Sequence, residues 1–229
     1  MDHSSNNPYQ RNDIRVGGRR ISSAGDLPEG VTVGFHDRSR GNLVSIAADG
    51  KFKNVVIDLG SAIDCTVSVG AIRVNFGGLR ISFVLNSGRC SKGVFVSVGG
   101  GSVLNGGTHI IGPLTPGVGV HLGSDCLIAS NVSIRGSSHH GLWDAETGEL
   151  LNAEAGITIG DHVWIGSDVV VLNKAEIASG SVIAARSVVN KRFDVKNALL
   201  AGIPAAVRRR NVEWTHEFPV DNGASRRTV

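Results

Sequence analysis

A period of six residues constrains the fold of this chain more than any other feature. Between residues 159 and 189 every sixth residue is Ile or Val, at Ile159, Ile165, Val171, Ile177, Ile183 and Val189. The residue four places after each of the first five is compact: Val163, Val169, Ala175, Ser181 and Ser187. A period of six fits neither the 3.6-residue turn of a helix nor the alternation of a plain strand. It is typical of a parallel β-helix of six-residue repeats, in which short strands stack coil upon coil.

The same period extends toward the N-terminus and then weakens. It recurs at Val98, Leu104 and Ile110 and, beyond Pro116, at Leu122, Ile128 and Ile134. Before that, residues 31–97 alternate like strands, as in the segment from Leu79 to Leu85, with only a suggestion of the six-residue period. The 31 glycines suit the tight turns between such strands. We therefore expect coils from about residue 31 onward, irregular ones first.

The register breaks once within the regular repeats. Ile134 and Ile159 are 25 residues apart, which is four sixes plus one, so a segment is inserted between them. This segment, residues 138–156, is polar and contains adjacent histidines, a tryptophan and several carboxylates. A long polar loop on a rigid scaffold is where binding and catalytic residues usually lie.

The ends of the chain differ from the repeats in composition. Residues 1–28 are polar and predict a flexible N-terminal arm, while 29–217 form the β-helix domain with the inserted loop 138–156. Pro204 limits helix formation, so residues 198–205 are predicted to form an extended lid over the last coils, and residues 207–217 a short helix. Residues 218–229 are predicted to be a disordered tail.

Several classes of protein are disfavoured by the sequence. No apolar run approaches the length of a membrane span, and the polar start lacks the apolar core of a secretion signal. The three cysteines have no metal-binding spacing, Cys126 falls at an inward repeat position, and we expect a reduced, cytoplasmic protein. Nucleic-acid binding would need a basic stripe interleaved with aromatic residues, and the only tight basic cluster is Arg208–Arg210.

Four segments together resemble a known family. They are SSHHGLWDAETGELLN at 137–152, IGDHVWIG at 159–166, SVVNK at 187–191 and AGIPAAV at 201–207. In this order and spacing the chain resembles the left-handed β-helix acyltransferases, in the branch that O-acetylates polysaccharides and sugar precursors. The resemblance is firm over residues 122–214 and loose over 31–121. It implies an all-β triangular left-handed prism, a homotrimer with active sites between subunits, acetyl-CoA as co-substrate, and a sugar or polysaccharide acceptor.

The resemblance also assigns the base. Acetyl transfer to a hydroxyl needs a group that takes the hydroxyl proton and a donor that stabilises negative charge on the thioester oxygen. The family has an Asp-x-His pattern at the mouth of this loop, and the matching residues here are Ser138-His139-His140. The match makes His140 the candidate base. His139 is the competing candidate and is assigned to substrate binding. A Ser at 138 does not stabilise imidazolium as a carboxylate does. Asp144 is the preferred replacement, with Glu146, Glu149 and Glu154 as alternatives.

Two tryptophans are candidate site residues. Trp164 should point outward from its repeat. The resemblance places it beside the acetyl group, where its indole N–H can donate a hydrogen bond. The alternative is that Trp164 is simply buried under a trimer interface. Trp143 in the loop is either a wall for the acceptor sugar or the anchor of the loop on a neighbouring chain. His162, which also points outward, is assigned to packing.

The predicted cofactor residues follow from the resemblance. Small residues at Gly166, Ser167, Ala184 and Ala185 leave backbone groups accessible to the pantetheine arm. Arg186 is expected either to narrow the groove for the pantetheine arm or to reach a phosphate of CoA. Lys191 and Arg208 match positions where the family has cations near the CoA phosphates. The alternative for each is an exposed surface cation without a function in binding. No metal is expected, and His36, His109, His121 and His216 have no partner at a useful spacing.

Three other functions are alternatives to sugar O-acetylation. An N-acetyltransferase for an amino sugar or a drug-like amine would share fold, cofactor and base. A zinc hydratase resembling the γ-class carbonic anhydrases needs three histidines, two of them five residues apart, and no pair here has that spacing. A non-catalytic scaffold would not need the His-containing insertion.

Overall fold

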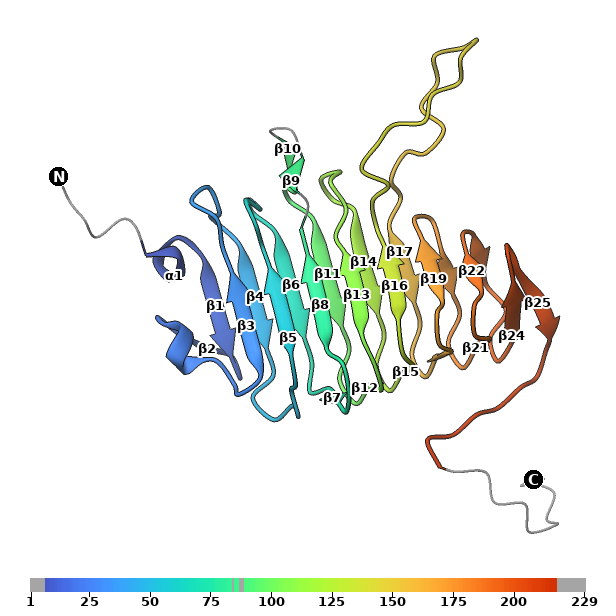
Figure 1. Cartoon of the computed structure of the whole chain (residues 1–229), viewed down its shortest axis with the longest axis horizontal. Helices are drawn as coiled ribbons and strands as arrows, with labels where there is room; N and C mark the ends of the chain where they lie inside the picture. Colours follow the sequence, from blue (N-terminus) through green and yellow to red (C-terminus); the bar gives the residue numbers. More distant parts are fainter. Residues whose placement is uncertain (1–6, 84, 87–88, 218–229) are drawn as a thin grey trace.

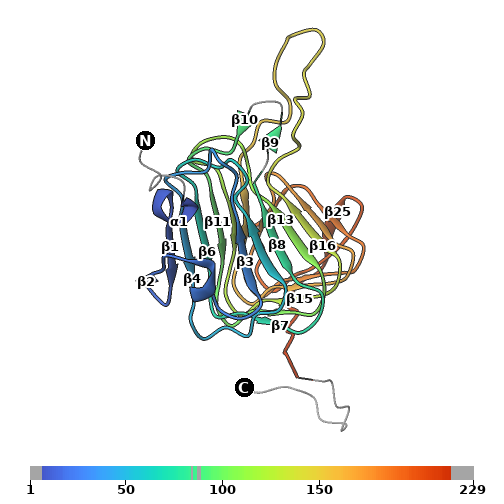
Figure 2. The ribbon, with the colours of Figure 1, turned by 60° about the vertical axis from the view of Figure 1, so that its left-hand side comes forward.

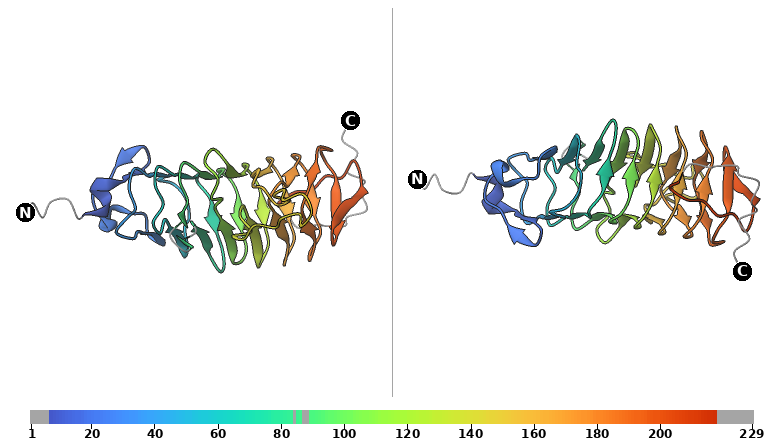
Figure 3. Two further views of the ribbon diagram at one scale, coloured as in Figure 1. Left: turned by 90° about the horizontal axis from the view of Figure 1, so that it is seen from above. Right: turned by 90° about the horizontal axis from the view of Figure 1, so that it is seen from below.

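Three parallel sheets form the walls of an elongated prism. The computed structural model describes residues 7–83, 85–86 and 89–217, and Figure 1 shows the strands lined up along the long axis, with the N-terminal strands at one end and the C-terminal ones at the other. A regular coil contributes one strand to each sheet, as β14 (Gly119–Leu122), β15 (Leu127–Ile128) and β16 (Val132–Arg135) do. The views in Figure 3 show the same succession from above and below.

The sheets are named A, B and C here. Sheet A contains β2 (Arg19–Arg20), β1 (Asp13–Val16), β4 (Leu43–Ile46), β6 (Thr66–Val69), β11 (Phe95–Val98), β14, β17 (Ile157–Ile159), β20 (Glu176–Ile177) and β23 (Arg192–Phe193). Sheet B contains β3 (Val31–Gly34), β5 (Val55–Asp58), β8 (Leu79–Ser82), β13 (Thr108–Ile111), β16, β19 (Val170–Leu172) and β22 (Val188–Val189). Sheet C contains β7 (Arg73–Val74), β12 (Val103–Leu104), β15, β18 (Trp164–Ile165), β21 (Val182–Ile183), β24 (Leu199–Gly202) and β25 (Ala205–Arg209). The chain passes from A to C to B in each coil, so the prism has an AC edge, a CB edge and a BA edge.

The six-residue period is the period of the core. Ile159, Ile165 and Val171 are fully buried, one on each sheet of a single coil. Parallel pairing places Ile128, Ile165, Ile183 and Leu200 in one column through sheet C. Burying such columns of aliphatic side chains is the main source of stability in a stacked-repeat fold. The predicted all-β fold of hexapeptide coils is confirmed, and its three parallel sheets are consistent with a left-handed β-helix.

The compact repeat positions lie at the corners between walls. Val163, Val169 and Ala175 are fully buried, and Cys126, which occupies the same position one coil earlier than Val163, is buried as well. Burial raises the pKa of the Cys126 thiol to about 11, because desolvation disfavours the thiolate. Cys126 is therefore a packed thiol, as expected.

The N-terminal segment differs from the flexible arm that we expected. After α1 (Pro8–Arg11), strand β1 pairs in parallel with β4, and β2 turns back on β1. Ile14 is fully buried and Tyr9 packs edge-on against Phe35 at 5.3 Å between ring centroids. A 3-10 turn, η2 (Ala24–Asp26), leads into the first complete coil. The segment covers the open end of the prism, where an uncovered coil would expose apolar side chains and unpaired backbone.

The early coils are also more regular than their sequence suggested. Strands β3, β5, β8 and β13 pair in register along sheet B, although the turns between them vary in length. A short hairpin, β9 (Leu85–Asn86) with β10 (Arg89–Cys90), leaves the prism at the BA edge. Turns of unequal length hide the period in the sequence without disturbing the stacking of the strands.

The C-terminal segment lacks the predicted helix. Strand β24 extends sheet C beside β21 and forms an antiparallel hairpin with β25, with a cis peptide bond at Ile203–Pro204; the segment is extended as predicted, but it belongs to the wall and does not cross the last coils as a lid. Residues 207–209 belong to β25, and residues 210–217 run without helical turns back along the prism, below it in Figure 1. The pairing of Leu200 with Val207 keeps this region extended. The predicted disordered tail, 218–229, lies outside the described residues, and no described helix is long and apolar enough to cross a membrane.

The close stacking of coils at the AC edge can be tested at Gly123. A Cβ there would lie 2.6 Å from the backbone carbon of Gly160 in the next coil, whereas a Cβ on Gly107 would meet nothing within 4 Å. We expect Gly123→Ala to lower the free energy of unfolding by about 1–3 kcal/mol. Gly107→Ala should change it by less than about 0.5 kcal/mol. Guanidinium denaturation followed by circular dichroism measures both, and equal midpoints would contradict this account of the edge.

Candidate functional site

The inserted segment forms a ribbon that projects from the BA edge. It connects β16 of sheet B to β17 of sheet A and rises well clear of the prism (Figures 1 and 2). Trp143 forms an antiparallel bridge with Leu150, and the N–H of Leu151 donates to the carbonyl of Leu142 at 2.8 Å. The two arms of the loop therefore hold each other in place, and the prism supports only their base.

The tip of the loop is closed by Asp144. One of its carboxylate oxygens accepts the backbone N–H groups of Glu146 at 2.9 Å and Thr147 at 2.7 Å. These hydrogen bonds lower the pKa of the Asp144 carboxyl, because they stabilise its charged form. Among the described contacts Asp144 binds loop backbone and neither histidine. Within one chain, then, Asp144 shapes the tip and does not orient His140 as we had expected.

Asn173, on the prism, clamps the returning arm. Its side-chain oxygen accepts the N–H groups of Ala155 and Gly156 at 2.8 and 3.2 Å, and its amide donates to the carbonyl of Ala153 at 2.9 Å. Three hydrogen bonds from one side chain fix the end of the loop on the scaffold.

Asn152 joins the two arms directly below the histidines. It accepts the N–H of Leu142 at 2.8 Å and donates to the carbonyl oxygen of His140 at 2.8 Å. The backbone position of His140 is therefore set by a side chain from the opposite arm. Sequence reasoning passed over Asn152, because an asparagine in a polar loop carries no signal of its own.

Glu154 ties the base of the loop to the turn between β13 and β14. Its carboxylate accepts the N–H groups of Leu114 and Thr115 at 2.8 and 2.7 Å. It faces the same cavity as the two histidines and acts to raise the pKa of His139. Of the four carboxylates considered as a partner for the imidazole, Glu154 is therefore the one that lines this cavity.

The cavity at the base of the loop has a volume of about 380 Å³. Its walls come from both arms of the loop and from the neighbouring turn: Leu114, Thr115, Ser137, Ser138, His139, His140, Gly141, Trp143, Leu150, Asn152, Ala153 and Glu154. The two histidines and Trp143, chosen from the sequence, are thus brought together. A concave site that is lined by two imidazoles at the base of an inserted loop has the usual form of a small binding site.

The two histidines differ in environment. His139 adopts a left-handed backbone conformation, with φ of 64°, and its ring is half-buried. Its Nε2 is buried without a hydrogen-bond partner among the described residues. Burial, followed by the positive charges of Arg135 and His140, lowers the pKa of His139. His140 is exposed at the mouth of the same cavity.

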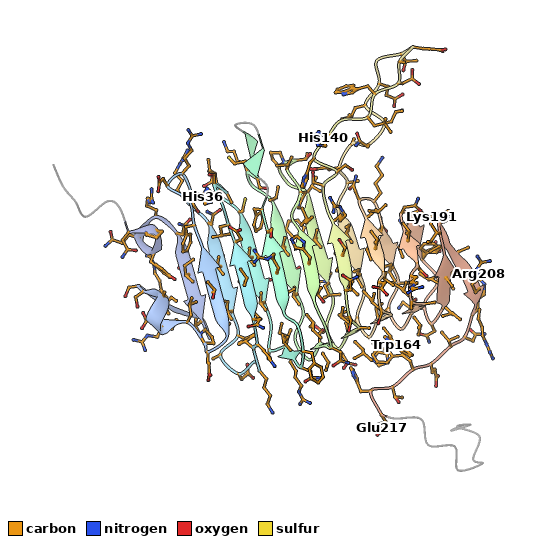
Figure 4. All side chains as sticks on the ribbon, viewed as in Figure 1. His36, His140, Trp164, Lys191, Arg208 and Glu217 are labelled. Atoms are coloured by element: carbon orange, nitrogen blue, oxygen red, sulfur yellow. The ribbon has the colours of Figure 1, made fainter. Side chains whose placement is uncertain are left out.

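Trp164 lies on a different side of the prism from the histidines. It begins β18 in sheet C next to the AC edge, is 40% exposed, and its ring lies 6.2 Å from that of Trp214. Figure 4 shows His140 on the upper side of the prism and Trp164 on the lower side, near the C-terminal segment. The outward orientation predicted for Trp164 is confirmed, but within one chain Trp164 does not meet His140.

The small residues predicted for the cofactor are stacked at the CB edge. Gly166 and Ser167 follow β18, and Ala184 and Ala185 follow β21 one coil later. A Cβ on Gly166 would lie 2.6 Å from the backbone nitrogen of Ala185, so only glycine allows this spacing. The N–H groups of Gly166 and Ala184 donate to the carbonyls of Ile183 and Leu200 in the next coil, so the role predicted for this backbone stays a prediction.

The predicted cations lie apart from one another. Arg186, at the CB edge, is largely exposed and is 3.8 Å from Asp168. Lys191 lies at the BA edge, on the same side as His140 in Figure 4, with its ammonium 5.5 Å from the ring centre of Phe193. Arg208, in β25 at the end of the prism, donates to the carbonyl of Ala201 at 3.1 Å. One chain therefore does not gather all of the predicted cofactor residues.

One cluster was missed by sequence reasoning. His216, expected to lack a partner, has its Nε2 3.1 Å from Asp125, and Asp125 is also 2.7 Å from Nδ1 of His162. The packing role predicted for His162 is confirmed, because its ring stacks on Trp214 at 4.1 Å between centroids and an interplanar angle of 11°. The inserted loop and the returning C-terminal segment separate these residues in sequence, so no local spacing reveals the group.

Comparison with known proteins follows the repeats. The family model described as bacterial transferase hexapeptide (six repeats) matches residues 156–191. The polysialic acid O-acetyltransferase of Escherichia coli O1:K1 / APEC is 34% identical over 128 residues, covering 54% of this chain and 41% of that protein. The galactoside O-acetyltransferase of Escherichia coli (strain K12) is 40% identical over 93 residues, covering 39% of this chain and 43% of that protein. The matched part of the chain thus spans about two fifths of the length of these curated relatives.

A solved structure shares the architecture over almost the whole chain. The polysialic acid O-acetyltransferase OatWY superposes with a TM-score of 0.57 at 18% identity, covering 92% of this chain and 93% of that one. At this identity the similarity shows the fold. Its repeats and the matched regions are therefore similar to those of hexapeptide-repeat acyltransferases, and over almost its whole length the chain shares their fold.

Proposed function

We propose that this protein is an acetyl-CoA-dependent O-acetyltransferase that acetylates a hydroxyl of a cell-surface polysaccharide or of its sugar precursor. The observation that carries the proposal is the cavity at the base of the inserted loop, where His139 and His140 converge beside Glu154 on a hexapeptide-repeat scaffold. Such a cavity offers a base for the acceptor hydroxyl without any covalent enzyme intermediate. The curated relatives support the reaction class, since those named above are O-acetyltransferases of sugars.

His140 is the residue that we propose as general base. The Nε2 of His139 is buried, so it is not open to an acceptor, whereas His140 is exposed at the mouth of the cavity. Asn152 fixes the backbone of His140 from the opposite arm. Burial lowers the pKa of His139, which favours its neutral form and so reduces the repulsion of a proton that arrives at His140.

The remaining parts of the site come from a second chain in this proposal. Trp164, Gly166, Ala184 and Arg208 all belong to sheet C or its CB edge, whereas His140 and Lys191 lie at the BA edge. We propose a cyclic homotrimer in which the BA edge of one chain lies against sheet C of the next, a heterologous contact that repeats around the axis. Acetyl-CoA then lies along sheet C of one chain, with its thioester between Trp164 and the neighbour's loop.

Exposed apolar side chains on the loop support this assembly. Leu142 and Trp143 are each 60% exposed and Leu151 is 47% exposed, all on a ribbon that projects away from its own prism. Apolar groups gathered on a projecting element usually contact another surface. We therefore assign Trp143 to the wall between the acceptor and the neighbouring chain.

The proposal also covers the compartment of the protein and an alternative acceptor. Cys65, Cys90 and Cys126 are free thiols, as suits a protein of the reducing cytoplasm. An N-acetyltransferase acting on a nucleotide-linked amino sugar would use the same fold, cofactor and base. The relatives named for O-acetylation favour a hydroxyl acceptor over an amine.

The base assignment is tested by exchanging one histidine at a time. His140→Ala should lower kcat for acetyl transfer by roughly 100-fold or more, the usual contribution of a positioned base, while His139→Ala should have a smaller effect. Thiol release from acetyl-CoA in the presence of acceptor measures both. If His139→Ala abolishes turnover and His140→Ala does not, the base is the other histidine; equal rates for all three proteins would exclude an imidazole base.

The acceptor is tested with a panel of sugars. We expect thiol release with acceptors that carry hydroxyls but no free amino group, among them oligosialic acids and galactosides, and none that depends on a free amine. The acetyl group in the product should be removed by mild alkali, because an ester is hydrolysed where an amide persists. Products that resist alkali and require an amino sugar would establish N-acetylation instead.

The shared site is tested by mixing two inactive variants. His140→Ala and Trp164→Ala each remove one half of every site, so each homo-oligomer should be inactive. When the two chains are refolded together in equal amounts, about a quarter of the sites combine an intact His140 with a neighbour's intact Trp164, and activity should recover to about that fraction. No recovery in mixed oligomers, verified by two affinity tags, would place both residues in one chain's site or remove Trp164 from it.

A further inference from the structure

A second cluster of ionisable side chains lies at the AC edge, away from the inserted loop. It consists of Asp125, His162 and His216, whose ligand atoms all lie within 4.8 Å of one another. Nδ1 of His162 is 2.7 Å from one oxygen of Asp125, and Nε2 of His216 is 3.1 Å from the other. Two imidazole nitrogens thus converge on a single carboxylate, an arrangement that the acyl-transfer proposal does not use.

The prism holds two of the three side chains in place. Asp125 and His162 occupy equivalent turn positions in successive coils, because β15 and β18 pair Leu127 with Trp164 and Ile128 with Ile165. Both have left-handed backbone conformations, with φ of 56° and 53°. Their side chains therefore emerge one above the other at the spacing of adjacent strands, about 4.8 Å. His216 completes the group from the C-terminal segment 210–217.

The hydrogen bonds of His162 define which of its nitrogens carries a proton. Its Nε2 is 3.2 Å from the backbone carbonyl oxygen of Trp214, which can only accept, so Nε2 is the donor. In a neutral ring the lone pair then sits on Nδ1 and faces the Asp125 carboxylate at 2.7 Å. This orientation allows Nδ1 and the carboxylate to bind one cation together, and with metal–ligand distances of about 2.0–2.2 Å the two atoms would move apart to about 3 Å when a metal ion binds.

The surroundings are those of a metal-binding histidine. Ligating histidines usually donate their second ring N–H to a backbone carbonyl or a carboxylate, as His162 does to Trp214. Two imidazoles and one carboxylate are a ligand set for Zn²⁺ and similar divalent ions, with three protein ligands leaving a further position open. A cavity of about 360 Å³, lined in part by Asp125 and His216, adjoins the cluster and has room for water in that position.

We propose that Asp125, His162 and His216 bind a divalent transition-metal ion, with Zn²⁺ as the representative, and that this ion fastens segment 210–217 to the prism. The segment is already docked through Trp214, which stacks on His162 and donates its indole N–H to the His162 carbonyl at 2.9 Å. The ion adds a bond from His216, two residues further along, to ligands that sit on two separate coils. It binds on the side of the prism that carries Trp164, and independently of the acyl-transfer chemistry.

The test measures metal binding by the full chain, prepared without a histidine tag and stripped with a chelator. Zn²⁺ titration by calorimetry should give one ion per chain in the wild type, and Zn²⁺ should raise the melting temperature. Asp125→Asn and His216→Gln should lose at least about 10-fold in affinity together with the thermal shift. His121→Gln is the matched control, because His121 is an exposed histidine bonded to Ser97 at 2.7 Å and lies outside the cluster.

Substitution of Co²⁺ gives a second readout that activity does not influence. Nitrogen and oxygen ligands in a low-coordinate site produce visible d–d absorption, which should appear in the wild type and in His121→Gln and vanish in the two cluster variants. Circular dichroism and the guanidinium midpoint, both in chelator, confirm that each variant is folded. His216 follows the last strand, so its replacement leaves the coils intact.

Two outcomes would overturn the proposal. If the cluster variants bind Zn²⁺ as tightly as the wild type, the ion sits elsewhere on the surface. If the wild type takes up no Zn²⁺, the cluster is only a pair of hydrogen bonds between the two imidazoles and Asp125.

Discussion

Every feature of this protein depends on how closely successive coils approach one another. Parallel strands must lie at hydrogen-bonding distance, and at the glycine positions of the AC edge this leaves no room for a Cβ atom. Cβ atoms built on Gly99, Gly123 and Gly160 would each fall 2.5–2.6 Å from atoms of the next coil. Because glycine at these positions allows the coils to approach closely, each inward position in a coil lies over its counterpart in the next.

The inserted loop and the C-terminal segment use this rigid stack in different ways. The loop is built from its own cross-arm contacts, and the prism holds only its base through Asn173 and Glu154. The C-terminal segment instead lies along the outside of the coils and is fixed by side chains of corner residues, His162 and Asp125. The corners, where a left-handed backbone turns side chains outward, are thus the points at which the scaffold can recruit other parts of the chain.

How far the sequence predicted the molecule depends on the range of the interactions involved. The six-residue period identified the core of the later coils correctly, since Ile159, Ile165 and Val171 are all buried. It failed at both ends: residues 8–28 pack on the first coil, and the helix expected at 207–217 is replaced by β25 and an extended segment. Pairing with β4 at one end, and the β24–β25 hairpin with contacts to the prism at the other, override the local composition, which alone would favour disorder or helix.

For the site, the sequence by itself determined that an insertion with adjacent histidines interrupts the repeats, because a break in a regular period is visible in one dimension. It also determined the inward and outward faces, including the exposure of Trp164, because side-chain direction follows the period. Only the tertiary structure decided that His140 and Trp164 lie on different sides of the prism, that Asp144 closes the loop tip, and that His216 reaches Asp125. These facts depend on which distant parts of the chain come together in the stacked coils and on which backbone N–H groups lack another hydrogen-bond acceptor. Local spacing in the sequence reveals neither.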